Sequence, residues 1–364
     1  MSGRAWPRVV TEGSAVHRSL RLARALAVIV VVFALPYLVP SFRLSQITSA
    51  CVLVTAVVGL NVLSGYGGQI SLGHAAFFGL GAYTTGILIS KNGLAPPLAF
   101  LASLAVCFVV GVVVGLPALR LHGTYLALLT LAVGVIFPSI VSRFEGLTGG
   151  DAGLFGLSYT PPNIPYFSGL AGQTVWLYWV VMICLGVSCL VVWNLMRSRT
   201  GRAIVALRDN ESAAIVMGVD RTVVRTLLFG VSSAIAGLAG GLYAVNTGII
   251  TPDAFSLLLT IYLLVAMVLG GSASFWGPVF GGFAIYFVPV WTSDLTRGAI
   301  AGVVFGVVII AMVFTMRSGI AGMLSKLAAY LVVIEPQPPK PAAVSPAQAR
   351  LPEKTKKTEA ISES

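Results

Sequence analysis

Long uninterrupted apolar segments constrain this chain more than any other feature of its sequence. A bilayer core about 30 Å thick needs roughly 20 helical residues to cross it. The segments are continuous, unlike the alternating ten-residue strands of an outer-membrane barrel. We therefore expect an all-α integral membrane protein, a polytopic bundle of about ten transmembrane helices with Gly-rich helix breaks. The expected spans, some of them short, are 25–41, 44–64, 72–90, 95–119, 123–141, 173–195, 222–247, 257–271, 276–292 and 298–316.

The composition supports this interpretation. Hydrophobic residues make up 57% of the 364 residues and charged residues only 10%, whereas soluble domains carry about 25% charged residues. Glycine pairs spaced four apart let helices approach closely in lipid, so we expect ordinary bundle packing there. The pairs are Gly111/Gly115, Gly237/Gly241, Gly277/Gly281 and Gly302/Gly306.

The basic residues indicate the orientation of the chain. If residues 1–24 are cytoplasmic and the chain crosses ten times, 19 of the 23 Lys and Arg residues lie on the cytoplasmic side and four outside. Cytoplasmic segments of membrane proteins carry such an excess. We therefore expect a multi-pass protein of the cell (inner) membrane with both termini in the cytoplasm. The net charge of +11 then reflects topology and anionic headgroups, not nucleic-acid binding.

The expected organisation has three parts: a basic cytoplasmic N-terminus (1–24), a transmembrane domain (25–330) and a cytoplasmic tail (331–364). The tail is rich in Pro, Lys, Ala and Ser and lacks apolar periodicity, so we expect it to be disordered. Segment 25–41 is followed by no small-residue cleavage site and is expected to be a retained first helix. The four cysteines lie inside apolar segments without metal-ligand spacing, so neither a metal site nor a disulfide is expected.

Two Gly-rich runs interrupt the apolar pattern. Residues 65–77 read Gly-Tyr-Gly-Gly-Gln-Ile-Ser-Leu-Gly-His-Ala-Ala-Phe, and residues 270–278 read Gly-Gly-Ser-Ala-Ser-Phe-Trp-Gly-Pro. Irregular backbone at membrane depth survives only where protein buries it or water lines it. Transporters use such breaks to bring polar groups to a solute. The alternatives are a tight cytoplasmic turn and, for His74, a structural histidine.

Several kinds of site are absent from the sequence. All twelve acidic residues fall outside the expected helix cores, whereas ion-coupled carriers commonly keep a carboxylate in the membrane. No G-x-x-x-x-G-K-[ST] loop for binding ATP occurs. No Ser/His, paired-Asp or His-cluster arrangement stands out either. We therefore expect no catalytic residues, no metal site and no cofactor, and any energy from ATP must come from a partner.

The polar, basic stretch 196–221 is expected to face the cytoplasm and to offer that partner a docking site. Asn210 can cap a short helix and Gly218 can end it. Such a helix would present one small apolar face, made of Ala213, Ala214 and Met217. The alternative is an amphipathic helix lying on the headgroups.

The same motifs carry a family resemblance. The run from Gly59 to Tyr83 resembles the hallmark of the branched-chain amino-acid ABC transporter permease family, of the LivM type. The resemblance covers roughly residues 40–322. Further matching segments are 116–121, 147–150, 201–218, 274–278 and 317–319.

The resemblance implies a transmembrane permease subunit of an ABC importer for branched-chain or other apolar amino acids. It also implies a second homologous permease, cytoplasmic ATP-binding subunits and an extracytoplasmic solute-binding protein as partners. The substrate pathway would include the matching motif residues Asn61, Gln69, Ser71 and His74. The segment coupled to the ATPase would include Arg202, Arg208, Asp209, Glu211, Ser212, Ala213, Ala214 and Gly218.

Three rival functions remain open at this point. A permease for urea, short amides or sugars would share the architecture. A passive channel or an ion-coupled carrier is disfavoured by the missing carboxylate and by the predicted helix in residues 202–218. An intramembrane enzyme is disfavoured by the absence of a catalytic arrangement.

Overall fold

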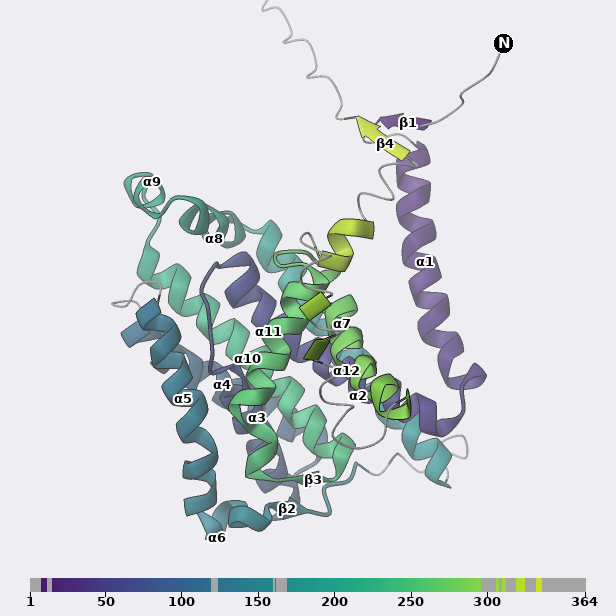
Figure 1. The fold of residues 1–364 in the computed structure, drawn as a ribbon, viewed down its shortest axis with the longest axis vertical. Helices are drawn as coiled ribbons and strands as arrows, with labels where there is room; N and C mark the ends of the chain where they lie inside the picture. The colour runs from purple at the N-terminus through teal and green to yellow at the C-terminus, as the bar shows by residue number, and fades with distance from the viewer. Residues whose placement is uncertain are drawn as a thin grey trace, which may run out of the picture. The chain divides into compact units, whose positions relative to one another are not determined.

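Figure 1 shows a computed structural model of the chain, which describes residues 8–11, 15–118, 124–159, 161, 169–295, 306, 307, 310, 311, 319–324 and 332–335. Residues 31–326 form one unit, and residues 1–30 and 327–364 belong to another. In the second unit β1 (Arg8–Thr11) pairs in parallel with β4 (Val332–Glu335). Strand β4 lies near the start of the predicted tail, 331–364, and is the part of that tail that the structure describes. The remainder of that tail lies outside the described residues.

The first unit is a bundle of apolar helices. Each predicted span between residues 25 and 292 corresponds to a helix, whereas the tenth span, 298–316, lies largely outside the described residues. Five helical segments in the described part of the chain are long and apolar enough to cross a membrane. The long helices of this unit are α2 (Ser41–Leu60), α3 (His74–Ser90), α4 (Pro96–Ala118), α5 (Thr124–Arg143), α7 (Gly169–Arg197), α10 (Arg221–Thr247), α11 (Leu257–Gly270) and α12 (Gly277–Leu295). Helix α1 (Ala15–Leu38) begins in the other unit, and η1 (Asn61–Tyr66) is a short continuation of α2.

Helix α1 begins ten residues before the predicted span. Residues 15–24 are rich in Ala, Leu and Arg, which favour helix over other conformations. The helix therefore continues through the basic stretch, which the prediction treated as a separate segment.

Helix α10 is the most buried of the five spanning segments and packs against α2, α3 and α4. Its glycines permit this close approach, since a Cβ atom at Gly240 would overlap the carbonyl oxygen of Phe78 on α3. Gly237 likewise lies against Cys107 of α4. The Ser232 hydroxyl donates to the carbonyl oxygen of Gly59 on α2, at 2.7 Å. The bundle packing predicted from the glycine pairs is confirmed for Gly237 in this way.

The two ends of the bundle differ. One end carries two helices that follow α7, namely α8 (Arg199–Asp209) and α9 (Glu211–Val216), and we call it the α9 end (Figure 1). The other end, called the hairpin end, carries short elements between the spanning helices. These are α6 (Glu145–Thr148), η2 (Gly150–Ala152), β2 (Leu154–Phe155), β3 (Ile249–Ile250) and η4 (Pro252–Phe255), with β2 and β3 antiparallel.

Candidate functional site

The first Gly-rich run breaks the helix and turns back into the bundle. The helix that starts at Ser41 ends at Tyr66, and its last turn, η1, is a π-helix. The chain then runs back beside it, because the Gln69 N–H donates to the Leu63 carbonyl and the His74 Nε2 lies 3.2 Å from the Ala56 carbonyl oxygen. At 1.5 Å per residue, Ala56 lies about 15 Å from the Tyr66 end of the helix. Helix α3 therefore begins well inside the bundle, which confirms the predicted helix break.

Side chains of neighbouring helices accept hydrogen bonds from main-chain N–H groups at the buried start of α3. The first N–H groups of a helix have no partner within it, and the residue before α3, Gly73, has no side chain to cap them. The Leu72 N–H donates to Thr130 Oγ1 of α5 at 2.9 Å. The Ala75 N–H donates to Thr260 Oγ1 of α11 at 3.1 Å. The start of α3 is thus fixed from both sides.

Asn61 connects the first break to the second. Its Nδ2 donates to the Ser274 carbonyl oxygen at 3.0 Å, and its Oδ1 accepts from the Ala273 N–H at 3.0 Å. Both partners lie in residues 271–276, the turn between α11 and α12. A Cβ atom at Gly65 would overlap Asn61 Oδ1, so the glycine leaves room for this side chain. Two segments more than 200 residues apart in sequence are therefore held together by one buried amide.

The predicted substrate-pathway residues separate into two groups. Asn61 and His74 are buried and hydrogen-bonded to main-chain groups. The Ala56 oxygen can only accept, so the His74 ring carries its proton on Nε2. By contrast, Gln69 Oε1 and Ser71 Oγ are buried without a hydrogen-bond partner among the described residues. Buried oxygens of this kind are rare in native proteins and call for a water, an ion or a solute.

At the α9 end, two short helices replace the one predicted. Ser198 caps α8, because its Oγ accepts from the Gly201 N–H at 3.2 Å. Asn210 then adopts an extended conformation between α8 and α9, and its Oδ1 accepts from the Ala213 N–H at 3.0 Å. Gly218, with φ of 85°, follows the end of α9. The predicted roles of Asn210 and Gly218 are confirmed, although α9 spans only Glu211–Val216.

The predicted apolar face of α9 is wrong in one respect. Ala214 is only 4% exposed and packs into the cluster that contains Leu207 and Val224, whereas Ala213 is exposed and Met217 is 85% exposed. Residues i and i+1 lie on different sides of a helix, so Ala214 anchors α9 while the neighbouring positions face outward. The exposed surface of α9, called the α9 tip, consists of Ser212, Ala213, Ile215, Val216 and Met217.

Glu211 fastens α9 to the start of α10. Its Oε1 accepts from Arg221 Nη1 and its Oε2 from Arg225 Nη2, both at 2.8 Å. Burial alone would raise the pKa of the Glu211 carboxyl, but the hydrogen bonds from the two arginines outweigh it and hold this pKa below its ordinary value. The Asp209 carboxylate pairs instead with its neighbour Arg208 at 2.9 Å and is well exposed.

We expect Glu211→Gln to lower the free energy of unfolding by about 1 kcal/mol at pH 7, because it removes both ion pairs. A carboxyl whose folded-state pKa is depressed stabilises the fold above its unfolded pKa and loses that contribution as the pH falls through the folded value. The loss of unfolding free energy in Glu211→Gln should therefore be complete above pH 4.5, the ordinary pKa of a glutamate carboxyl. In stronger acid the variant and wild type should become equally stable. Thermal melting in detergent across this pH range measures it. Asp209→Asn is the matched control and should melt like wild type, whereas an equal loss in both variants would contradict the account.

The α8 helix rests directly on the first break. The side chain of Arg208 lies over Gly68, where an added Cβ atom would be 2.7 Å from Arg208 Cγ. Ile204 and Leu207 of the same helix are buried in one cluster with Leu63 of η1. Of the residues predicted for ATPase coupling, Arg208 therefore lies beside the first break, against the residue that precedes Gln69.

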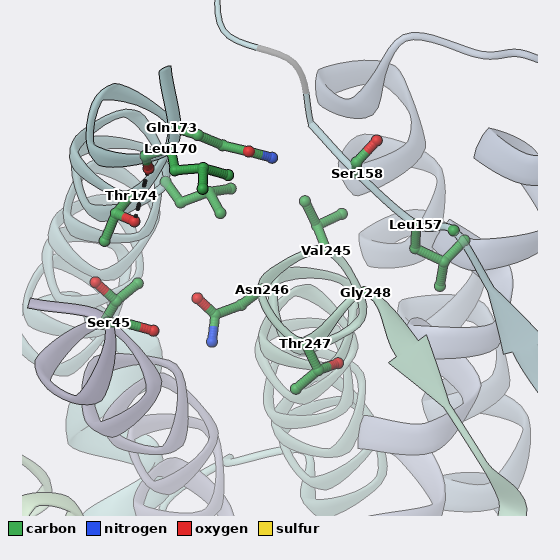
Figure 2. Close-up of a pocket in the computed structure, with 13 residues that line it drawn as sticks. Ser45, Leu157, Ser158, Leu170, Gln173, Thr174, Val245, Asn246, Thr247 and Gly248 are labelled. Carbon is green, nitrogen blue, oxygen red and sulfur yellow. Dashed lines mark hydrogen bonds between the residues drawn. The ribbon is translucent and has the colours of Figure 1, made fainter. Parts of the chain in front are cut away.

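A pocket of about 450 Å³ opens at the hairpin end, far along the bundle from these breaks. Figure 2 shows Asn246 pointing from α10 toward α2, and Gln173 and Thr174 on α7 beside it. The Asn246 Nδ2 donates to Ser49 Oγ of α2 at 2.9 Å. Among the described residues, the lining is uncharged and includes none of the predicted site residues. It consists of Ser45, Thr48, Gly156, Leu157, Ser158, Leu170, Gln173, Thr174, Leu177, Val245, Asn246, Thr247 and Gly248.

Sequence reasoning missed three contributors to the site around the breaks. Thr260 caps an N–H in the first turn of α3, and Thr130 binds the N–H of Leu72 just before the helix. A single threonine within an apolar helix gives no signal of either role. The pairing of Asn61 with residues 273 and 274 was also missed. The two Gly-rich runs gave a partial signal, since each interrupts a helix.

Comparisons with known proteins agree with the sequence resemblance. Residues 42–313 match the family described as the permease component of the branched-chain amino acid transport system. The high-affinity branched-chain amino acid permease protein LivM of Salmonella typhimurium is 32% identical over 286 residues, which cover 72% of this chain and 66% of that protein, just under two thirds of its length.

Other relatives are more distant. The probable branched-chain amino acid permease LivH of Methanocaldococcus jannaschii is 26% identical over 219 residues, or 57% of this chain and 66% of that protein. The autoinducer 2 import permease LsrC of Salmonella typhimurium is 27% identical over 312 residues, or 77% of this chain and 83% of that protein. No solved structure gives a significant match.

Proposed function

Since the chain belongs to the family of branched-chain amino acid transport permease components, we propose that it is a transmembrane permease subunit of an ATP-driven importer. Its solutes are branched-chain or other apolar amino acids. ATP is hydrolysed by separate subunits, and this chain is not itself an enzyme. The relatives named above are permease components of transport systems.

The observation that carries this proposal is the position of α8 and α9. The α9 tip exposes large apolar side chains, with Val216 and Met217 both 85% exposed, at an end of the bundle rather than along its sides. The base of the same segment rests on the first helix break through Arg208 and Gly68. An ATPase bound at the α9 tip could therefore act on the bundle interior through α8.

The proposed topology follows from the charges. The α9 end, with Arg197, Arg199, Arg202, Arg221 and Arg225, faces the cytoplasm in this proposal, as the positive-inside rule requires. Helix α3 then starts in the cytoplasmic half of the membrane, and the pocket in Figure 2 opens to the outside. Both termini lie in the cytoplasm.

The proposed partners are a second homologous permease, cytoplasmic ATP-binding subunits and an extracytoplasmic solute-binding protein. Matches to both LivM and LivH, two permeases of branched-chain amino acid transport, support a pair of related permeases. The absence of a phosphate-binding Lys motif in this sequence supports separate ATP-binding subunits.

The solute path that we propose passes Gln69 and Ser71. Their buried oxygens lack partners among the described residues and can bond a passing polar group. We assign Asn61 and His74 a structural part instead, because their polar atoms are already bonded to main-chain groups.

A second candidate function is import of a small polar solute. The match to an autoinducer 2 import permease, which covers 77% of this chain, favours it. It differs from the main proposal in the solute only.

Uptake by the assembled transporter distinguishes the two. Proteoliposomes that contain this chain, its co-purified subunits and the solute-binding protein are loaded with ATP and given labelled leucine, isoleucine or valine. We expect ATP-dependent accumulation of these amino acids that excess unlabelled leucine abolishes. Accumulation of a small polar solute with no uptake of leucine would establish the second candidate. Equal entry with and without ATP would contradict both and indicate a passive channel.

A further inference from the structure

We propose that Arg208 and Asn61 form a mechanical link through which movement of α8 and α9 is passed to both helix breaks at once. In this link Asn61 is a positioning residue that keeps the second break in register with the first. The inference rests on the proposed function, because it assigns the route by which an ATPase at the α9 tip acts on the solute path.

The first joint of this link is the contact between Arg208 and Gly68. The aliphatic part of Arg208 covers Gly68, whose φ of 65° places it in the left-handed region that favours glycine. The guanidinium group of Arg208 pairs with Asp209, whose Oδ1 lies 2.9 Å from Arg208 Nη2. Beneath it, Leu207 is buried in the cluster that includes Leu63. Helix α8 cannot shift toward the bundle at Arg208 without displacing Gly68.

The second joint is the Asn61 amide, which needs both of its polar ends. An asparagine amide supplies a donor and an acceptor together, and here the donor bonds Ser274 and the acceptor bonds Ala273. Ala273 has a φ of 57°, and no other described residue except glycines has a positive φ. Such a conformation persists only where the surroundings hold it. The Asn61 bond to its N–H is one of the contacts that do so.

These joints lie in series along one short path. Asn61 is the first residue of η1, and Gly68 lies two residues after the last, Tyr66, so the main chain of η1 connects the two joints. A displacement of Gly68 therefore moves Asn61, and Asn61 moves the turn between α11 and α12. Both breaks respond to the same movement of α8, instead of opening independently.

The test measures how much solute is transported for each ATP hydrolysed, in proteoliposomes containing the full complex. Asn61→Ala and Asn61→Leu both remove the two hydrogen bonds, and Leu, which branches at Cγ as Asn does, leaves no cavity in place of the amide. We expect ATP hydrolysis to continue and the amount of solute transported per ATP to fall about tenfold. The size of this effect corresponds to the loss of the two hydrogen bonds between Asn61 and the turn 271–276. Tyr178→Phe is the matched control. It removes one partly buried hydrogen bond between α7 and α1, from the Tyr178 hydroxyl to the Val32 carbonyl, which involves no residue of either break, and should leave the ratio unchanged.

Variants of Arg208 provide a second, independent test of the link. Arg208→Lys keeps the aliphatic stem over Gly68, whereas Arg208→Ala removes it. We expect Arg208→Lys to transport as much solute per ATP as wild type, and Arg208→Ala to transport less. Equal ratios for both Arg208 variants, or a wild-type ratio in either Asn61 variant, would overturn the link. If neither Asn61 variant inserts into the membrane, the comparison of the two Arg208 variants decides alone.

Failure of this inference is distinguishable from failure of the proposed function. If wild-type complex couples ATP hydrolysis to uptake while every variant couples equally well, only the link is wrong. If wild-type complex shows no ATP-dependent uptake, the proposed function fails first and the link with it.

Discussion

Replacing Ala213 by arginine is expected to abolish ATP-driven uptake while leaving the protein inserted in the membrane. Ala213 lies on the α9 tip, where it is exposed in this chain, and its backbone N–H donates to the capping Asn210 Oδ1 irrespective of its side chain. The fold should therefore tolerate the change. At a closely packed interface with an ATPase, however, a long charged side chain must be buried without a partner. Uptake should fall on the order of 100-fold.

Initial uptake rates of labelled leucine, normalised to the amount of protein in the membrane, measure this effect. Ala213→Ser is the control at the same position, since it adds one small polar atom, and its uptake should stay close to wild type. Co-purification of the ATP-binding subunits should be lost with Ala213→Arg and retained with Ala213→Ser. Unchanged uptake in Ala213→Arg would contradict coupling through α9 and favour a channel.

Replacing Gly240 by valine is expected to prevent formation of the bundle. The Cβ atom would overlap the main-chain oxygen of Phe78, and backbone atoms of α3 cannot move aside as a flexible side chain can. Overpacking a filled core costs about 1–3 kcal/mol even where side chains can adjust. Here the helices α3 and α10 must separate, so the loss should exceed that range. Membrane yield and a monodisperse profile in mild detergent should both be lost.

Gly186→Val is the matched control for this prediction. Gly186 is also inside a long helix, α7, but no atom of the described residues lies within 4 Å of an added Cβ atom there. The same substitution should leave yield and melting temperature nearly unchanged. Similar behaviour of the two variants would show that helix propensity, rather than the contact of α3 with α10, governs the effect.

The helices of this fold were predictable because lipid imposes a length on apolar segments that no soluble core imposes. Spans such as 222–247 and 257–271 agree with α10 and α11 to within a residue or two. The start of α1 was not predictable from hydropathy, since the helix continues through basic residues. Helix propensity there outweighs the change in polarity.

The candidate site was predictable only in part. The Gly-rich runs revealed that helices break, and Asn210 and Gly218 revealed where α9 begins and ends, because these signals are local. The packing of Ala214 into the bundle and the bonds from Asn61 to residues 273 and 274 depend on segments distant in sequence. No pattern within one segment contains that information.

The most direct test of the central claim is purification of the tagged protein in mild detergent, with identification of the chains that accompany it and an assay of ATP hydrolysis. The account predicts a second, related permease and ATP-binding subunits in stable association, with ATPase activity that the solute-loaded binding protein stimulates. A homogeneous oligomer of this chain alone, without ATPase activity, would contradict the importer and leave a channel or an ion-coupled carrier in its place.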